Sequence, residues 1–127
     1  MDKKIIFTEL APRAVGPYSQ AIEVGGWIYL SGQIPISPET NQVISGTIEE
    51  QTELVLTNSK RVLEAAGASL ENVVKVTLYI SDMDNFARIN EVYSRFFLSA
   101  PPARSAVQVA RLPKDVDIEV DMVAYTG

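Results

Sequence analysis

The sequence contains neither cysteine nor histidine. Without cysteine there can be no disulfide, no thiolate nucleophile and no cysteine-ligated metal, and without histidine the most common general base and zinc ligand is missing. We therefore expect no metal site and no covalent thiol catalysis. Any chemistry must come from carboxylates, Arg, Lys, Tyr, Ser and backbone groups.

Basic residues are also few: 11 Lys and Arg stand against 16 Asp and Glu, which gives a net charge of −5 and a pI near 4.7. A nucleic-acid-binding protein usually carries a basic stripe, and none is visible here. No apolar run approaches the roughly 18 residues that a membrane span needs. The opening MDKKIIFTEL lacks the apolar core of a signal peptide. These absences predict a soluble, cytoplasmic protein.

The chain shows no internal repeat, no low-complexity segment and no linker, so we expect a single domain over residues 1–127. The loop over residues 10–20 contains two prolines and a glycine and is predicted to be ordered. Gly25 and Gly26 suit a two-residue hairpin turn. Strands are predicted over residues 5–7, 21–24, 27–31, 73–80, 103–109 and 117–125.

Two helices are predicted from caps and apolar periodicity. Thr47 and Glu50 have capping-box spacing, and Gly67 stands where a C-terminal cap belongs. Asp82 or Asp84 can cap the second helix, which two consecutive prolines end. The apolar stripes, which we interpret as core, are Ile48, Val55, Val62 and Ala66 in the first helix and Phe86, Ile89, Tyr93 and Phe96 in the second.

The predicted order is therefore β-β-β-α-β-α-β-β. Two helical crossovers on one face of a mixed sheet give an α+β two-layer sandwich. The other face of the sheet also needs cover. Because only two helices are available, self-association into a closed cyclic assembly is the expected solution.

The segment PPARSAVQVARLP (101–113) places one arginine in a run of small side chains. Its alternation puts Arg104, Ala106 and Gln108 on one face of a strand and Ser105, Val107 and Val109 on the other. A guanidinium can hold a carboxylate through two parallel hydrogen bonds. Arg104 is therefore either a ligand clamp or a member of an ion pair at the surface or at a subunit interface.

Glu119 lies on the opposite strand face from Ile118 and Val120. If residues 113–117 close an antiparallel hairpin, Glu119 comes near Gln108 and diagonal to Ala106, within reach of the face that carries Arg104. A carboxylate there could orient or deprotonate a water. The alternative is a solvated strand residue.

Two further positions have both a functional and a structural interpretation. At the end of the third strand, Ser31 offers a hydroxyl, and Gly32 lets a ligand approach the backbone closely. Tyr18 could cover a pocket with its ring. Equally, Ser31 and Gly32 suit the turn that ends a strand, and Tyr18 could anchor its loop to the core.

Four motifs, read together, resemble one family. They are GPYSQA (16–21), SGQIP (31–35), NEVY (90–93) and PARSAVQVARLPKDVDIEVDMVA (102–124). In order and spacing the chain resembles the reactive intermediate deaminase family, RidA, formerly called YjgF, essentially from end to end. The resemblance implies a chorismate-mutase-like fold assembled as a homotrimer, with a cleft at each subunit interface. It also implies cofactor-free hydrolysis of enamine and imine intermediates, such as 2-aminoacrylate and 2-iminobutanoate, to 2-oxo acids and ammonia.

The same resemblance assigns roles to individual residues. Arg104 matches the clamp for the substrate carboxylate, and Glu119 matches the carboxylate that positions water. Many members carry a cysteine where this chain has Ala106, so only the backbone of Ala106 remains to bind a ligand, and regulation through a thiol is not expected. The positions that match the lining of the cleft are Tyr18, Ser31, Gly32 and Asn90.

Two other functions remain open at this point. A non-catalytic trimer that senses 2-oxo acids and regulates a partner protein would use Arg104 without needing Glu119. RNA cleavage, attributed to some members of the family, fits poorly with an acidic chain that has no histidine.

Overall fold

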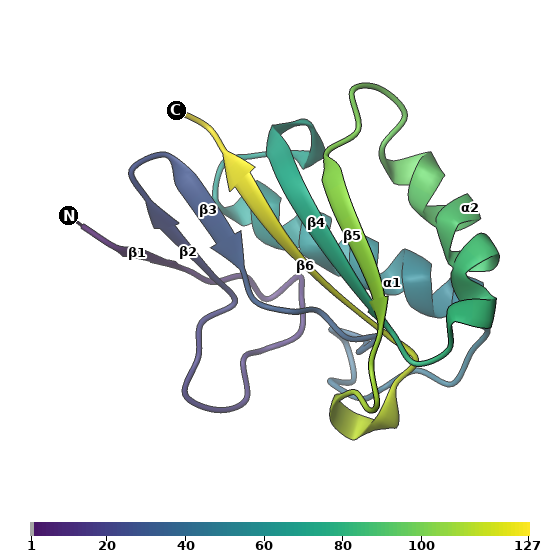
Figure 1. The fold of residues 1–127 in the computed structure, drawn as a ribbon. Coiled ribbons are helices and arrows are strands. Elements are labelled where there is room, and N and C mark those ends of the chain that lie inside the picture. The colour runs from purple at the N-terminus through teal and green to yellow at the C-terminus, as the bar shows by residue number, and fades with distance from the viewer. Residues whose placement is uncertain (1) are drawn as a thin grey trace.

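A computed structural model describes residues 2–127, which form a six-stranded mixed sheet and two α-helices (Figure 1). The sheet has the order β1-β2-β3-β6-β4-β5. The predicted sequence of elements and the α+β class are confirmed. The elements are β1 (Lys4–Ile6), β2 (Ala21–Val24), β3 (Trp27–Leu30), α1 (Ile48–Ala65), β4 (Val73–Ile80), α2 (Phe86–Phe96), β5 (Ala103–Gln108) and β6 (Ile118–Tyr125).

The last two strands do not form the hairpin that the sequence suggested. β6 lies between β3 and β4 and is antiparallel to both, whereas β5 is parallel to β4 on its other side. The two flanking segments continue past the end of β4: the N–H of Val109 donates to the Ile80 carbonyl (3.0 Å), and the N–H of Ser81 donates to the Asp117 carbonyl (3.1 Å). Both edges of the buried strand β4 are therefore paired, and a 3₁₀ turn at Pro113–Asp115 carries the chain across its end.

Both helices cover the same face of the sheet, where the core lies (Figure 1). Alternation along β6 shows this directly, because every second side chain is buried and the intervening ones are partly exposed. β5 is one of the two edge strands, and α2 connects β4 to β5 as a parallel crossover. The buried positions of β6 are Ile118, Val120, Met122 and Ala124.

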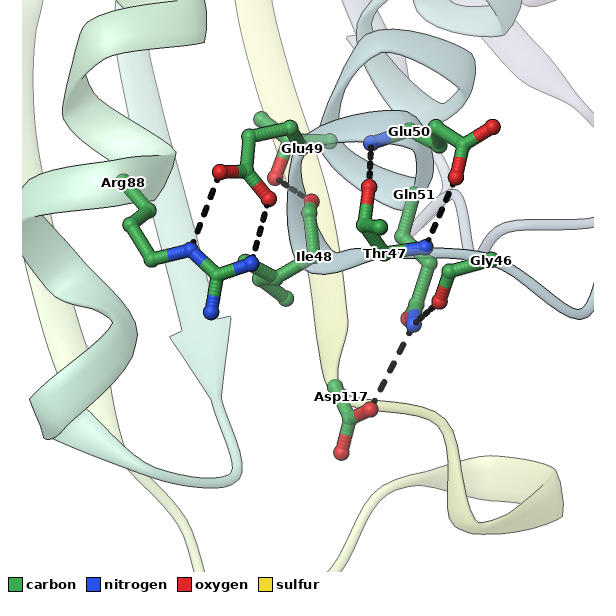
Figure 2. A network of polar contacts seen from close by, with 9 residues as sticks. Gly46, Thr47, Ile48, Glu49, Glu50, Gln51, Arg88 and Asp117 are labelled. Atoms are coloured by element: carbon green, nitrogen blue, oxygen red, sulfur yellow. Dashed lines mark hydrogen bonds and ion pairs between the residues drawn. The ribbon is translucent and has the colours of Figure 1, made fainter.

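The predicted start of α1 is confirmed (Figure 2). The Thr47 hydroxyl accepts from the N–H of Glu50 (3.1 Å), and the Glu50 carboxylate accepts from the N–H of Thr47 (2.9 Å). Gly67, just past the C-cap, has φ +79°, the left-handed conformation that glycine adopts most easily. Asp82 caps a 3₁₀ turn at Met83–Asn85 that leads into α2, so α2 itself begins at Phe86 without a side-chain cap.

Side chains from the first turn of α1 connect it to its neighbours (Figure 2). Arg88 of α2 donates two hydrogen bonds to the Glu49 carboxylate, at 2.9 and 2.7 Å. Gln51 donates to Asp117, just before β6, at 3.4 Å. The two helices are thereby joined to each other and to the end of the sheet where β6 begins.

The second face of the sheet is left without helices in residues 2–127. It exposes large apolar side chains between 40% and 63% of their surface: Ile5, Trp27, Tyr29, Val107 and Tyr125. This is the face for which the sequence predicted cover by self-association. Neither helix in the described residues is long and apolar enough to cross a bilayer.

Candidate functional site

A cavity of about 480 Å³ brings together four of the predicted site residues. They come from three separate parts of the chain: the loop before β2, the turn after β3, and β6 itself. The side chains that line the cavity therefore meet only because β6 is placed next to β3 in the sheet. The four are Tyr18, Ser31, Gly32 and Glu119.

Gln20 holds the loop that forms one wall of this cavity. Its side chain is buried, with 3% exposed, and accepts from the N–H of Thr8 (2.7 Å) while donating to the carbonyls of Thr8 (3.0 Å) and Pro12 (2.8 Å). Ser31 contributes a second tie, because its hydroxyl donates to the Ser19 carbonyl at 2.6 Å. Ser31 thus has a structural hydrogen bond, and its oxygen keeps accepting capacity toward the cavity. The loop is ordered, as predicted.

The absence of a side chain at Gly32 makes room for the Glu119 carboxylate. A Cβ placed on Gly32 would overlap with the Glu119 Oε2 atom and lie 2.8 Å from its Cδ. The φ angle of Gly32 is not in the left-handed region, so the need for glycine is steric rather than conformational. The approach of the two strands explains why the third strand ends in glycine at this point.

The surroundings of Glu119 favour its protonated form. Partial burial raises the pKa of its carboxyl group, and the nearby charge of Asp121 raises it further. Asp121 lies on the same face of the sheet as Glu119 because it is two residues further along β6, and the Tyr79 hydroxyl of the adjacent strand donates to it at 3.1 Å. A carboxylate with a raised pKa is a stronger proton acceptor, as expected of a general base.

Arg104 belongs to a second group of residues, at the edge of the sheet beside α2. Its Nη1 donates to the Asn90 Oδ1 at 2.7 Å. Its guanidinium carbon lies 4.8 Å from the centre of the Tyr93 ring and 5.3 Å from that of Phe86. Ala106, two residues along β5, faces the same side and packs against the core. Three predicted site residues, Arg104, Asn90 and Ala106, are therefore close together.

Arg104 differs from the other arginines near α2 and β6 in its choice of partners. Arg88, Arg95 and Arg111 each form an ion pair with a carboxylate, at 2.7, 3.3 and 2.6 Å. Within residues 2–127, Arg104 has no acidic partner, and its one hydrogen-bond acceptor is a neutral amide. Its positive charge is thus uncompensated and most of its N–H donors remain available. Of the ion pairs considered for this residue, the surface pair within one chain is not formed in residues 2–127.

The two groups of site residues lie on opposite faces of the sheet, and the predicted contact between them is wrong. Along the sheet, Arg104 pairs with Val76, whose side chain faces the helices, whereas Glu119 pairs with Tyr79, which faces the open side. β4 also separates β5 from β6. Glu119 therefore cannot reach the Arg104 face within one chain. The hairpin assumption failed because β6 pairs with β4 rather than with β5.

Several residues at these sites were not predicted. Phe86 and Tyr93 were interpreted only as core. However, Phe86 precedes Asn90 by four residues and Tyr93 follows it by three, so all three side chains lie on one side of α2. The cavity wall also contains Arg13 and Lys114, neither of which forms an ion pair in the described residues. No signal in the sequence distinguished these two cations from ordinary surface residues.

Comparison with known proteins identifies relatives over nearly the whole chain. A family model described as endoribonuclease L-PSP matches residues 8–126. A RutC family protein of Pyrococcus abyssi is 58% identical, over 98% of each chain. The 2-iminobutanoate/2-iminopropanoate deaminase of Dermatophagoides farinae is 46% identical, over 95% of this chain and 94% of its own. The crystal structure of Escherichia coli TdcF with bound serine has a TM-score of 0.93 at 44% identity, covering 98% of this chain and 99% of TdcF.

Proposed function

The chain belongs to the reactive intermediate deaminase family, for which the matching model carries the description endoribonuclease L-PSP, and we propose that it hydrolyses 2-imino acids to 2-oxo acids and ammonia. The proposed substrates are 2-iminobutanoate and the imine form of 2-aminoacrylate. A relative named 2-iminobutanoate/2-iminopropanoate deaminase supports this substrate class. The serine bound to TdcF supports a site that accepts a small molecule with an α-carboxylate.

The observation that carries the proposal is the uncompensated guanidinium of Arg104. A charged group that is held in place by a neutral amide and two rings, with donors to spare, suits an anionic ligand. Each proposed substrate has one carboxylate next to the carbon that is attacked. Arg104 would hold that carboxylate and so fix the position of the reacting carbon.

We further propose a homotrimer in which each cleft is formed by two copies. Arg104 and Asn90 would come from one copy, and the cavity with Tyr18, Ser31 and Glu119 from the next. Two observations support this: the two groups are separated within one chain, and the sheet face next to Glu119 exposes large apolar side chains. A ring of identical interfaces would cover that face and complete one site per interface.

The hydrolysis needs no cofactor in this scheme, because a protonated imine is already electrophilic. Glu119 takes a proton from water as the water oxygen bonds to the imine carbon and the C=N π electrons move to nitrogen. The resulting tetrahedral carbinolamine receives on its nitrogen the proton that Glu119 holds. Glu119 then takes the proton of the carbinolamine hydroxyl as the C=O bond forms and the C–N bond breaks, and the nitrogen leaves as ammonia. Glu119 passes this second proton to ammonia or to solvent, which accounts for the positive charge of the protonated imine. Arg13 and Lys114 at the cavity would raise the local concentration of anionic substrates.

The test is the release of 2-oxobutanoate from 2-iminobutanoate generated in situ. The wild-type protein should accelerate release, and Arg104→Ala should abolish the acceleration, since loss of a charge-assisted clamp removes roughly 2–5 kcal/mol of binding. Arg95→Ala is the matched control. Arg95 is an arginine in the last turn of α2, and unlike Arg104 it forms an ion pair with a carboxylate, that of Glu91. Full activity of Arg104→Ala would refute the assigned mechanism.

Glu119→Gln separates an enzyme from a non-catalytic carboxylate sensor. If the protein is a deaminase, this variant should lose turnover by about 10²–10⁴-fold and still bind 2-oxobutanoate. Wild-type protein that binds 2-oxobutanoate but does not accelerate imine hydrolysis would instead support the sensor. RNA should remain intact in the presence of the wild-type protein, because the chain has no histidine and carries more acidic than basic residues.

A further inference from the structure

We propose that the ring faces of Tyr93 and Phe86 hold the guanidinium of Arg104 in the orientation that binds the substrate carboxylate. The two residues would act as positioning residues: they contact Arg104 rather than the substrate, and they determine how tightly the substrate is bound. This inference rests on the proposed function of Arg104 and goes beyond it, since it assigns a role to residues that would otherwise be plain core.

The geometry places three side chains of α2 around one cation. Phe86, Asn90 and Tyr93 are spaced by four and three residues, so they lie on one side of the helix. The guanidinium carbon of Arg104 is 5.3 Å from the Phe86 ring centre and 4.8 Å from the Tyr93 ring centre, within the range of cation–π attraction. Asn90 accepts one N–H at 2.7 Å.

This way of holding an arginine has a specific consequence for ligand binding. An acidic partner would occupy the N–H edge of the guanidinium and compensate its charge, as carboxylates do for Arg88 and Arg111. Ring faces attract the cation without accepting its N–H groups. The rings therefore restrict the rotamers of a long side chain while its donors stay available for a carboxylate. Less conformational freedom is then lost when the substrate binds.

The Tyr93 hydroxyl makes no contribution to this arrangement. Tyr93 is 6% exposed, and its hydroxyl oxygen has no hydrogen-bond partner among the described residues. Burial raises the pKa of the Tyr93 phenol, and the charge of Arg104 opposes this effect only in part. The phenol is thus neutral and contacts Arg104 through its ring. Phenylalanine should be able to replace it.

The experiment compares four single variants of α2 in the full chain, together with Arg104→Ala and the double variant Tyr93→Leu/Arg104→Ala. Tyr93→Leu and Phe86→Leu each remove one ring face, and Tyr93→Phe keeps the ring. Phe96→Leu is the matched control, because Phe96 is an aromatic residue of α2 that packs against the core and is not among the rings under Arg104. For each variant, kcat and KM are measured with 2-iminobutanoate generated in situ, the Kd of 2-oxobutanoate is measured by calorimetry, and folding is monitored by thermal denaturation.

Tyr93→Leu should raise KM and the Kd of 2-oxobutanoate by roughly 2- to 5-fold with a smaller change in kcat, in line with one cation–π contact of an exposed arginine. Phe86→Leu should act in the same direction, and less strongly, because its ring is farther away. Tyr93→Phe should keep the wild-type KM, because it keeps the ring. Combining Tyr93→Leu with Arg104→Ala should add nothing to the loss of 2-oxobutanoate binding.

The inference would be overturned by unchanged KM and Kd in folded Tyr93→Leu, or by equal increases in Tyr93→Leu and in the control Phe96→Leu. A KM raised equally by Tyr93→Phe would also contradict it, since the hydroxyl would then be the relevant group. Failure of the proposed function would give a different result. The wild-type protein itself would then not accelerate imine hydrolysis, and the Kd of 2-oxobutanoate would still show whether the two rings affect carboxylate binding.

Discussion

Gly32→Ala should inactivate the protein while leaving its fold almost unchanged. The new methyl group would occupy the space of the Glu119 Oε2 atom. Because the overlapping atoms are the far end of a flexible side chain, Glu119 can turn away at little cost. The backbone at Gly32 has no left-handed φ, so alanine is not strained there. Only the position of the carboxylate should change.

The size of the effect follows from the role that we propose for that carboxylate. A displaced general base no longer aligns the attacking water, and general-base catalysis is worth about 10²–10⁴-fold in rate. We expect kcat with 2-iminobutanoate to fall by at least about 100-fold, with the Kd of 2-oxobutanoate within roughly threefold of wild type, because Arg104 is untouched.

The assay combines steady-state kinetics with thermal denaturation and a double variant. The free energy of unfolding of Gly32→Ala should lie within about 1 kcal/mol of the wild-type value. The Glu119 side chain moves aside, and this leaves neither a buried cavity nor a lasting clash. Added to Glu119→Gln, it should cause little further loss of kcat, because both changes act on one group. Near-normal kcat in a folded Gly32→Ala protein would refute the assignment of Glu119 as the base.

Two further predictions concern pH and stability. Glu119 must be ionised to accept a proton, so kcat/KM should fall as the pH drops through its raised pKa. Asp121→Asn removes the neighbouring charge, so it should lower the pKa of Glu119 and shift the acidic limb of the pH profile to lower pH. An unshifted limb would contradict the electrostatic cause. Thr47→Ala should cost about 0.5–2 kcal/mol of unfolding free energy, since it removes the hydroxyl that accepts from Glu50, and chemical denaturation will show whether the capping box stabilises α1 to this extent.

Local signals in the sequence were sufficient for most elements of this fold. The capping box at Thr47 and Glu50, the left-handed Gly67 and the β-branched run of β4 each act within a few residues, and each was predicted correctly. The cap of α2 was displaced by one turn, because Asp82 caps the 3₁₀ turn that precedes the helix. Such boundaries depend on local hydrogen bonds that several residues can satisfy equally well.

Strand pairing was the part that local signals could not provide. The short connection between β5 and β6 is typical of a hairpin, but β6 instead pairs with β4, whose residues from Lys75 to Ile80 face it in one continuous register. The turn at Pro113–Asp115 crosses the end of β4 because a buried strand must have both edges hydrogen-bonded. That choice is made by the whole sheet rather than by the turn.

The error in pairing also explains what the sequence missed about the site. Arg104 and Glu119 were each singled out as unusual residues for their strands, yet their relative placement depends on which strand lies between them. The rings under Arg104 were missed for a similar reason. Phe86 and Tyr93 form an ordinary apolar stripe until β5 brings a cation onto their faces.

The most direct test of two-copy sites is to mix two inactive variants. Arg104→Ala keeps the Glu119 group of residues, and Glu119→Gln keeps the Arg104 group. After the two proteins are unfolded and refolded together in equal amounts, each interface of a closed ring has about a one-in-four chance of joining both intact groups. The account predicts that the mixture recovers about a quarter of the wild-type rate of 2-iminobutanoate hydrolysis, whereas each variant refolded alone stays inactive. A mixture that remains as inactive as its components, although it contains mixed oligomers, would contradict a site shared between copies.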